Sequence, residues 1–165
     1  GVIKAYTTRV GEGPFPTELL DADGERLGKV GHEFGATTGR ARRCGWFDAV
    51  VARYGVHLNG VDALVLTKVD VLDGFNTIKV CTGYKYKGKI FPDMPADPEV
   101  IANCDPVYVE FDGWSESTLG IQDYDKLPQN AKNYIDRLSE LVETPFMMIS
   151  TGPDREQTIL RESLF

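Results

Sequence analysis

Apolar side chains recur at helical spacing in two segments of the chain. In residues 44–58 this spacing places Trp46 and Tyr54 on one face. In residues 131–142 a second apolar stripe follows Pro128, and proline is common in the first turn of a helix. We therefore predict two helices, each with one buried face.

Shorter apolar and β-branched runs predict strands. Residues 146–149 are continuously apolar, which is typical of a strand buried on both faces. Alternation around Lys87-Gly88 predicts a hairpin over 77–91, and Asp23-Gly24 predicts another between 17–20 and 26–30. Residues 92–106, which contain four prolines, are predicted as a loop. The other predicted strands are 2–8, 63–67 and 107–111. The pattern indicates an α/β fold with a mixed sheet and flanking helices.

Composition narrows the classes of protein that fit this pattern. The chain has 165 residues, of which 42% are hydrophobic, so it is long enough for one globular domain with its own core. Its net charge of −7 makes nucleic acid a poor partner. No apolar run is long enough to span a membrane, and three cysteines without a C-x-x-C pair favour reduced thiols in a cytoplasmic protein. With only two histidines besides, we expect no zinc site.

A short glycine- and threonine-rich segment followed by arginines is the local exception to the acidic composition. It reads Gly-Ala-Thr-Thr-Gly-Arg-Ala-Arg-Arg over residues 35–43. Because the predicted helix at 44–58 would begin directly after it, its arginines and the helix N-terminus would together attract an anion. An arginine run can also be a solvated helix face, but in an acidic chain we favour ligand binding.

A second candidate site lies after two of the predicted strands. The strand at 63–67 leads into Thr67-Lys68-Val69-Asp70, the T-K-x-D pattern that reads guanine in many GTP-binding proteins, and the strand at 146–149 leads into Ser150-Thr151-Gly152. Ligands of open α/β sheets sit at the carboxyl ends of strands, so both loops are expected to border one site. The Asp70 carboxylate would accept from guanine N1–H and its exocyclic amine, a donor pair that adenine lacks. The plain alternative is a surface carboxylate.

Several other residues have simpler structural interpretations. The aromatic side chains of Trp46, Phe47 and Tyr54 are predicted to lie in the core rather than on a ligand. His32 and His57 are predicted to be structural, because no nucleophile or carboxylate motif accompanies either. Cys44 lies beside the arginines, which would lower a thiol pKa, but without a paired base we interpret it as a packing residue. 

Taken together, these stretches resemble the adenylosuccinate synthetase family. The resemblance rests on residues 6–18, 33–40, 66–74, 113–118 and 150–155, which occur in the order of the family and cover almost the whole chain. It implies a ligase that joins IMP and L-aspartate to adenylosuccinate through 6-phosphoryl-IMP, with GTP as co-substrate, Mg²⁺ as cofactor and a homodimer as the assembled enzyme. It also implies that the chain is the carboxy-terminal domain of a larger P-loop-related synthetase.

The resemblance assigns roles to residues of both candidate sites. The loop residues Ala36, Thr37, Thr38, Gly39, Arg40, Ala41 and Arg42 match the family's aspartate-binding loop. Val10 and Arg40 match positions that contact IMP. The positions that match GTP contacts are Arg42, Lys68, Val69, Asp70, Ser150, Thr151 and Gly152.

Parts of the family pattern are absent from this sequence. It contains no G-x-x-x-x-G-K or G-D-E-G-K-G-K phosphate loop, so we expect no catalytic aspartate, no catalytic histidine and no Mg²⁺ ligand here, and no activity from the chain alone. Three other classes stay open: a stand-alone guanine-nucleotide-binding module, an interaction or dimerisation module without catalysis, and an aspartate-binding regulatory domain.

Overall fold

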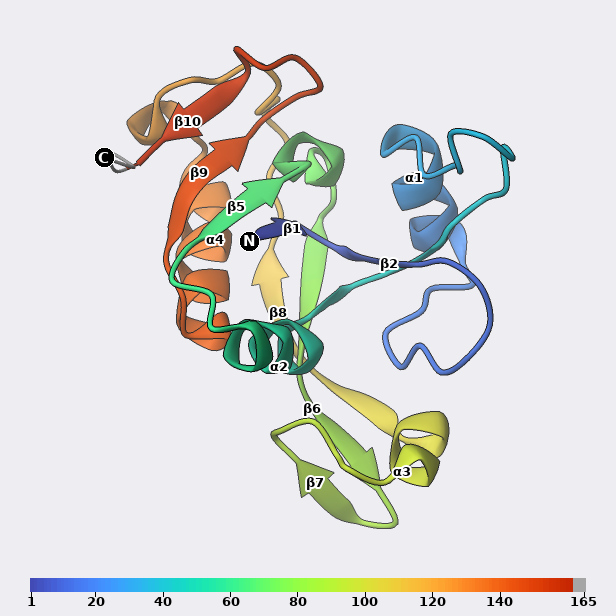
Figure 1. Ribbon diagram of the computed structural model, residues 1–165. Helices are drawn as coiled ribbons and strands as arrows, with labels where there is room; N and C mark the ends of the chain where they lie inside the picture. The colour runs from blue at the N-terminus through green and yellow to red at the C-terminus, as the bar shows by residue number, and fades with distance from the viewer. Residues whose placement is uncertain (162–165) are drawn as a thin grey trace. The chain divides into compact units, whose positions relative to one another are not determined.

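The computed structural model describes residues 1–161, and the chain divides into two compact units (Figure 1). The first unit is built from residues 1–5, 52–78 and the segment from 110 onward, and the second from 6–51 and 79–109. The first unit therefore combines three stretches of chain, so its core depends on contacts between residues far apart in the sequence.

A four-stranded mixed sheet forms the centre of the first unit. Its order is β1 (Val2–Lys4), β5 (Leu64–Thr67), β9 (Phe146–Ser150) and β10 (Thr158–Leu160). β5 pairs in parallel with both β1 and β9, whereas β10 is antiparallel to β9. The predicted α/β class with a mixed sheet is confirmed, as are the strands near 63–67 and 146–149.

Helix α4 (Gln129–Val142) belongs to the same unit (Figure 1), and its apolar stripe is buried. Tyr134, Ile135 and Leu138 are fully buried. The Tyr134 hydroxyl donates to the carbonyl of Ala5 at 2.7 Å, and Pro128 occupies the N-cap position. The helix predicted from the spacing of its apolar residues is thus confirmed.

The second unit contains two further sheets. β2 (Thr7–Arg9) pairs with β3 (Arg43–Gly45), and β4 (Phe47–Asp48) pairs with β6 (Thr77–Tyr86), which also pairs with β7 (Lys89–Phe91) and β8 (Asp105–Asp112). Lys87 and Gly88 both have positive φ in the turn from β6 to β7. This confirms the predicted hairpin, because two-residue hairpin turns of this kind require positive φ at both positions.

The hairpin predicted around Asp23-Gly24 is wrong, because these residues begin helix α1 (Ala22–Val30). The Asp21 carboxylate accepts hydrogen bonds from the backbone N–H groups of Asp23 and Gly24 and so caps the helix. Gly24 is needed for a close approach rather than for a turn, since a Cβ there would overlap the carbonyl oxygen of Leu19.

The helix predicted over 44–58 begins later, as α2 (Ala49–Asn59). Residues 43–48 instead form β3 and β4, and the Asp48 carboxylate caps α2 by accepting from the N–H groups of Val50 and Val51. Trp46 and Phe47 are buried as predicted, but Tyr54 is 48% exposed, so its assignment to the core is wrong.

Two smaller predictions also need correction. The strand predicted at 2–8 is divided into β1 and β2. The predicted loop at 92–106 contains a short helix, α3 (Pro98–Asn103), whose first turn is capped by the Asp97 carboxylate. The buried residues Val50, Cys81 and Tyr84 form a small core in the second unit.

Candidate functional site

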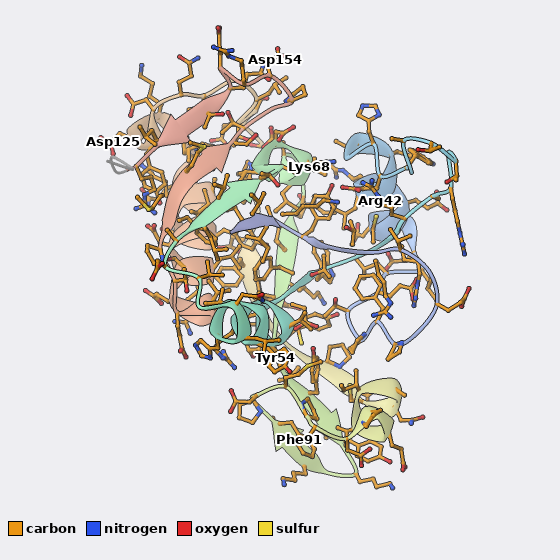
Figure 2. All side chains as sticks on the ribbon, viewed as in Figure 1. Arg42, Tyr54, Lys68, Phe91, Asp125 and Asp154 are labelled. Carbon is orange, nitrogen blue, oxygen red and sulfur yellow. The ribbon has the colours of Figure 1, made fainter. Side chains whose placement is uncertain are left out.

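The two loops predicted to read guanine leave the same edge of the first unit's sheet. β5 and β9 run in parallel, with Leu66 opposite Ile149, so their carboxyl ends point the same way. Lys68 directly follows β5, and β9 ends at Ser150; Figure 2 marks the two loops by Lys68 and Asp154. The two loops therefore leave the sheet at one edge, as expected, and a ligand site bordered by both stays a prediction.

The backbone turns sharply at Lys68. Its φ of 63° is in the left-handed region, and a 3-10 turn, Val69–Leu72, follows at once. Positive φ in a residue other than glycine is uncommon and is found disproportionately at binding sites. Val69 is fully buried and anchors the turn, so the side chains on either side of it are held at the edge of the sheet.

Asp70 lies in this turn, half-buried. Burial raises the pKa of its carboxyl, the charge of Asp73 raises it further, and Lys68 opposes these effects. A carboxylate that is partly removed from water gains more from a donor pair on a ligand than a fully hydrated one does. This environment suits the predicted role of Asp70 in binding a base.

The side chains of Ser150 and Thr151, in the second loop, make hydrogen bonds within the protein. The Ser150 hydroxyl donates to the Gly152 carbonyl at 2.8 Å. Thr151 is fully buried, and its hydroxyl donates to the carbonyl oxygen of Ile121 at 2.8 Å and lies 3.2 Å from that of Gln157. Its side chain therefore has a structural role. At Gly152 a Cβ would overlap the end of the Gln157 side chain, so a larger residue there would require that side chain to move.

Asp73 organises the first loop and was missed as a site residue in the sequence analysis. Its carboxylate accepts from Trp114 Nε1 at 2.7 Å, from the Thr118 hydroxyl at 2.8 Å and from the Thr118 backbone N–H at 2.7 Å. The only sequence signal was that residues 66–74 and 113–118 are both parts of the family resemblance.

The arginine-rich loop of the second unit is a closed hairpin. Phe34 and Ala41 form a β-bridge, and Gly35 N–H donates to the Arg40 carbonyl at 2.8 Å. Gly39 has a φ of 65°, which glycine adopts without strain. The residues at its tip are all exposed, namely Ala36, Thr37, Thr38, Gly39, Arg40 and Ala41.

The loop does not lead into a helix N-terminus. It leads into strand β3, and the next helix, α2, begins at Ala49 with its first N–H groups capped by Asp48. The predicted contribution of a helix dipole to an anion site is therefore wrong. Any attraction for an anion comes from the arginine side chains themselves.

The three arginines have different surroundings. Arg40 is 67% exposed and lies 3.8 Å from the Glu12 carboxylate. Arg42 Nη1 donates to Glu33 Oε2 at 2.8 Å, and this carboxylate is fully buried. Arg43 forms a two-pronged ion pair with Glu18, at 2.7 and 2.6 Å. The exposed Arg40 is thus best placed to meet a ligand, and Arg43 is structural.

Arg43 also connects the strand after the loop to the segment that contains Val10. Its Nη1 donates to the carbonyl oxygens of Gly11 and Gly13, at 3.1 and 2.9 Å. Val10 itself directly follows β2 and is 72% exposed. Val10 and Arg40, the two residues expected to contact IMP, thus flank one network of contacts within the second unit.

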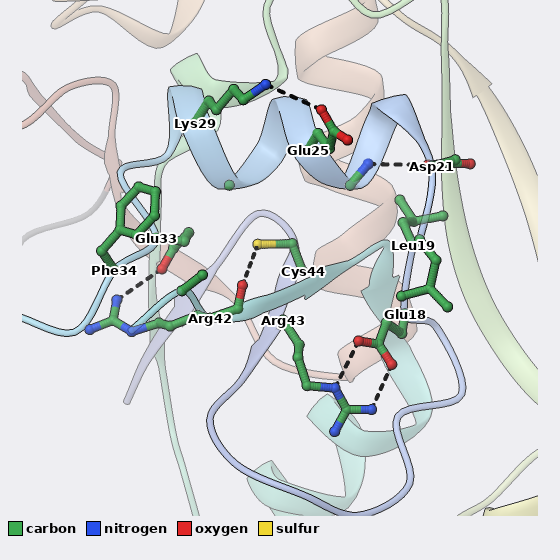
Figure 3. A pocket seen from close by; sticks show the side chains of 14 residues that line it. Glu18, Leu19, Asp21, Glu25, Lys29, Glu33, Phe34, Arg42, Arg43 and Cys44 are labelled. Atoms are coloured by element: carbon green, nitrogen blue, oxygen red, sulfur yellow. Dashed lines mark hydrogen bonds and ion pairs between the residues drawn. The ribbon is translucent and has the colours of Figure 1, made fainter. Parts of the chain in front are cut away.

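A cavity of about 350 Å³ lies beside this network (Figure 3). Arg42 and Glu33 line one part of it, and the Arg43–Glu18 pair lines another. The Cys44 side chain also faces it, 5% exposed, with its thiol donating to the Arg42 carbonyl at 3.5 Å. The interpretation of Cys44 as a packing residue is confirmed.

Residues 1–161 offer neither a metal-binding cluster nor a membrane-spanning helix. This part of the chain holds no group of three His, Cys, Asp or Glu side chains that could bind a metal ion. Nor does any helix in it have the length and apolar character needed to cross a membrane. His57 contacts the Glu143 carboxylate at 3.1 Å, and His32 is exposed with a φ of 49°.

The known proteins to which this chain is similar belong to the family that its motifs resemble. A sequence profile described as adenylosuccinate synthetase matches residues 1–159. The chain is 56% identical over 165 residues to the adenylosuccinate synthetases of Geobacter sulfurreducens and Trichlorobacter lovleyi, and it spans 38% of each. The solved structure of fully ligated adenylosuccinate synthetase from Plasmodium falciparum matches 98% of this chain and 39% of its own, with a TM-score of 0.92 and 40% identity.

Proposed function

The chain belongs to the adenylosuccinate synthetase family, and on that premise we propose that it is the carboxy-terminal part of a ligase that makes adenylosuccinate. In this reaction GTP phosphorylates the six-position oxygen of IMP. The amine of L-aspartate then displaces that phosphate, so GDP, phosphate and adenylosuccinate are released. This chain would supply the guanine site and the aspartate-binding loop, and the remainder of the enzyme would supply the phosphate loop.

The observation that carries this proposal is the parallel pairing of β5 and β9. It brings the turn with Lys68 and Asp70 to the same sheet edge as the loop with Gly152. Asp70 would accept from guanine N1–H and the exocyclic amine, and the Lys68 stem would lie along the purine face. Backbone groups near Gly152 would contact the guanine O6. The partial burial of the Asp70 carboxylate supports this role.

The arginine loop supports the aspartate part of the proposal. L-aspartate carries two carboxylates, and a guanidinium binds a carboxylate through two parallel hydrogen bonds. Arg40 is exposed at the loop and would bind aspartate and reach the IMP ribose, with Val10 lying against IMP. Arg42 is partly exposed beside Glu33 and would also reach GTP.

The family supports a proposal for the cofactor and the assembly. Adenylosuccinate synthetases use GTP and Mg²⁺. Residues 1–161 offer no cluster of carboxylates, cysteines or histidines for a metal ion, so we propose that the Mg²⁺ ligands lie in the remainder of the enzyme. We also propose that the complete enzyme is a homodimer in the cytoplasm.

A calorimetric titration tests the guanine site. The chain is titrated with GDP and with ADP, and the Asp70→Asn variant is compared with Asp62→Asn, which changes an exposed carboxylate before the amino end of β5. We expect GDP to bind in preference to ADP, and this preference to be lost only in Asp70→Asn. Equal binding of both nucleotides, or a preference that survives Asp70→Asn, would contradict the proposal.

The same titration separates the alternatives. A dimerisation module or an aspartate-binding domain would bind neither nucleotide selectively. If neither nucleotide binds, the titration is repeated with the rest of the Geobacter sulfurreducens enzyme supplied in trans. GDP binding that then depends on Asp70 supports the ligase, and continued absence of binding contradicts it.

A further inference from the structure

A segment not assigned to any ligand connects the two loops of the guanine site. We call residues 114–121 the strap. At its first end, the Asp73 carboxylate accepts from Trp114 Nε1 at 2.7 Å and from the Ser117 hydroxyl at 3.3 Å. It also accepts from the hydroxyl and the backbone N–H of Thr118, which is fully buried. The strap is therefore fixed to the turn that holds Asp70.

The other end of the strap is fixed to the second loop. Gly120 N–H donates to the Thr151 carbonyl at 3.1 Å, and the Thr151 hydroxyl donates to the Ile121 carbonyl at 2.8 Å. Within the strap, Ile121 N–H donates to the Thr118 carbonyl at 3.2 Å. The strap thus holds the turn after β5 and the loop after β9 at a set separation.

Between these two anchors lies Leu119. It is 55% exposed, yet the residues on both sides of it are held by hydrogen bonds. Its Cδ1 atom lies 3.0 Å from the position that a Cβ on Gly152 would take. The side chain therefore lies against the glycine of the guanine loop and presents a large apolar surface beside it.

We propose that the strap is a third part of the purine site, in which Leu119 offers an apolar surface to the face of the base. In this arrangement Asp73 is a positioning residue, because it fixes both the strap and the turn of Asp70, whose carbonyl accepts from Asp73 N–H at 3.2 Å. The inference rests on the proposed guanine site and adds to it a source of affinity and a source of rigidity.

The two roles have different kinetic signatures. An apolar surface contacts the face of any purine, so removing it weakens binding of all purine nucleotides by the same factor. If Asp73 no longer fixes the turn, the hydrogen bonds from the base to Asp70 weaken. The preference for a base with both N1–H and an exocyclic amine over a base with N1–H alone then falls. Inosine has N1–H but no exocyclic amine, and ITP is therefore the informative comparison with GTP.

The experiment measures kcat and KM for GTP and ITP in the complete ligase that contains this chain. For Leu119→Ser we expect KM to rise about tenfold for both nucleotides with kcat unchanged. The matched control is Leu58→Ser, another exposed leucine of the first unit, which lies in α2 ahead of the amino end of β5. A Leu119→Ser variant that behaves as Leu58→Ser overturns the role of Leu119.

For Asp73→Asn we expect the preference for GTP over ITP to fall about tenfold, because an amide cannot accept all the hydrogen bonds that the carboxylate accepts. Thr118→Val, which removes only one donor to Asp73, should shift the preference in the same direction, and Thr118→Ser should restore it. If these variants lower the midpoint of thermal unfolding but leave the GTP-to-ITP preference unchanged, the strap is structural only and the inference is wrong.

The outcome for Asp70→Asn separates this inference from the proposed function. If Asp70→Asn retains the wild-type preference for GTP over ITP, the guanine site itself is wrong and the strap has no purine site to complete. If Asp70→Asn loses the preference while the strap variants retain it, only the inference fails.

Discussion

The guanidinium of Arg42 donates at 2.8 Å to the carboxylate of Glu33, which is fully buried, while Arg42 itself remains 31% exposed. The same carboxylate accepts from the Tyr6 hydroxyl at 2.6 Å. An exposed loop is thus connected through one arginine to a buried anion. Arg42 therefore stabilises the fold as well as being a candidate ligand contact, whereas Arg40 has no comparable buried partner among the contacts described.

This difference predicts that two alanine substitutions destabilise the fold to different extents. Arg42→Ala removes one partner of a buried carboxylate, so we expect the free energy of unfolding to fall by about 2–3 kcal/mol. Arg40→Ala removes an exposed side chain, so we expect a change within about 0.5 kcal/mol. Urea denaturation of both variants measures this, and equal losses would contradict the structural distinction.

The expected effect of Arg40→Ala is on the KM for aspartate of the complete ligase. Arg40→Ala would remove the proposed charge-assisted, two-pronged contact to aspartate, so we expect the KM for aspartate to rise about tenfold to 100-fold. Because its stability is expected to be unchanged, an unaltered KM for aspartate would show that Arg40 does not bind that substrate.

The ion pair of Arg43 with Glu18 predicts a dependence of stability on pH. The hydrogen bonds from Arg43 lower the pKa of Glu18 in the folded protein below its ordinary value of 4.5. A carboxyl with a lowered folded pKa contributes stability that is present above about pH 4.5 and is lost as the pH falls through the folded pKa. Urea denaturation at several pH values should show a smaller acid-side loss for Glu18→Gln than for the wild type. Parallel curves for the two proteins would contradict this assignment.

Elements with one dominant local signal were predictable from the sequence. The stripe of α4 has helical spacing and a proline before its first turn, and β9 is a short apolar run. The Asp23-Gly24 pair misled because its meaning depends on Asp21, which caps a helix instead of starting a turn. Residues 43–48 misled for another reason. Residues 44–48 are all buried, the charged Asp48 included, so no alternation of apolar and polar positions marks a strand there.

In the candidate site, too, local features were predictable and contacts between distant residues were not. The T-K-x-D pattern and the carboxyl ends of two strands could be read from the sequence, because each is a local feature. The role of Asp73 could not, since its partners Trp114 and Thr118 are 41 and 45 residues away along the chain. Likewise, nothing local distinguishes the structural Arg43 from the exposed Arg40, because their partners come from the segment around residues 11–18.

Two glycines of the first unit predict opposite effects of substitution by alanine. Gly55 lies inside α2 with no atom within 4 Å of an added Cβ, so Gly55→Ala should raise the free energy of unfolding by about 0.5–1 kcal/mol. At Gly113 an added Cβ would overlap the Phe75 carbonyl oxygen, so Gly113→Ala should lower it by more than about 2 kcal/mol. The midpoints of urea denaturation measure both. A Gly113→Ala variant as stable as the wild type would contradict the close packing of these two segments.

The exchange Asp70→Asn predicts a change of base preference from guanine to xanthine. Guanine presents two donors to the carboxylate, at N1 and at the exocyclic amine. Xanthine presents N1–H and a carbonyl oxygen, which match the acceptor and the donor of an asparagine amide. Toward guanine the amide would instead place its own donor against the exocyclic amine, which leaves a hydrogen bond unmade.

We therefore expect the ratio of KM for GTP to KM for XTP in the complete ligase to rise about 100-fold or more in Asp70→Asn. Burial raises the pKa of the Asp70 carboxyl, so at neutral pH the ionised group lowers the stability of the folded state. The variant should for that reason unfold at the same temperature as the wild type or at a higher one. This thermal measurement separates a changed preference from damage to the fold. A stable variant that still prefers GTP over XTP would show that Asp70 does not read the base.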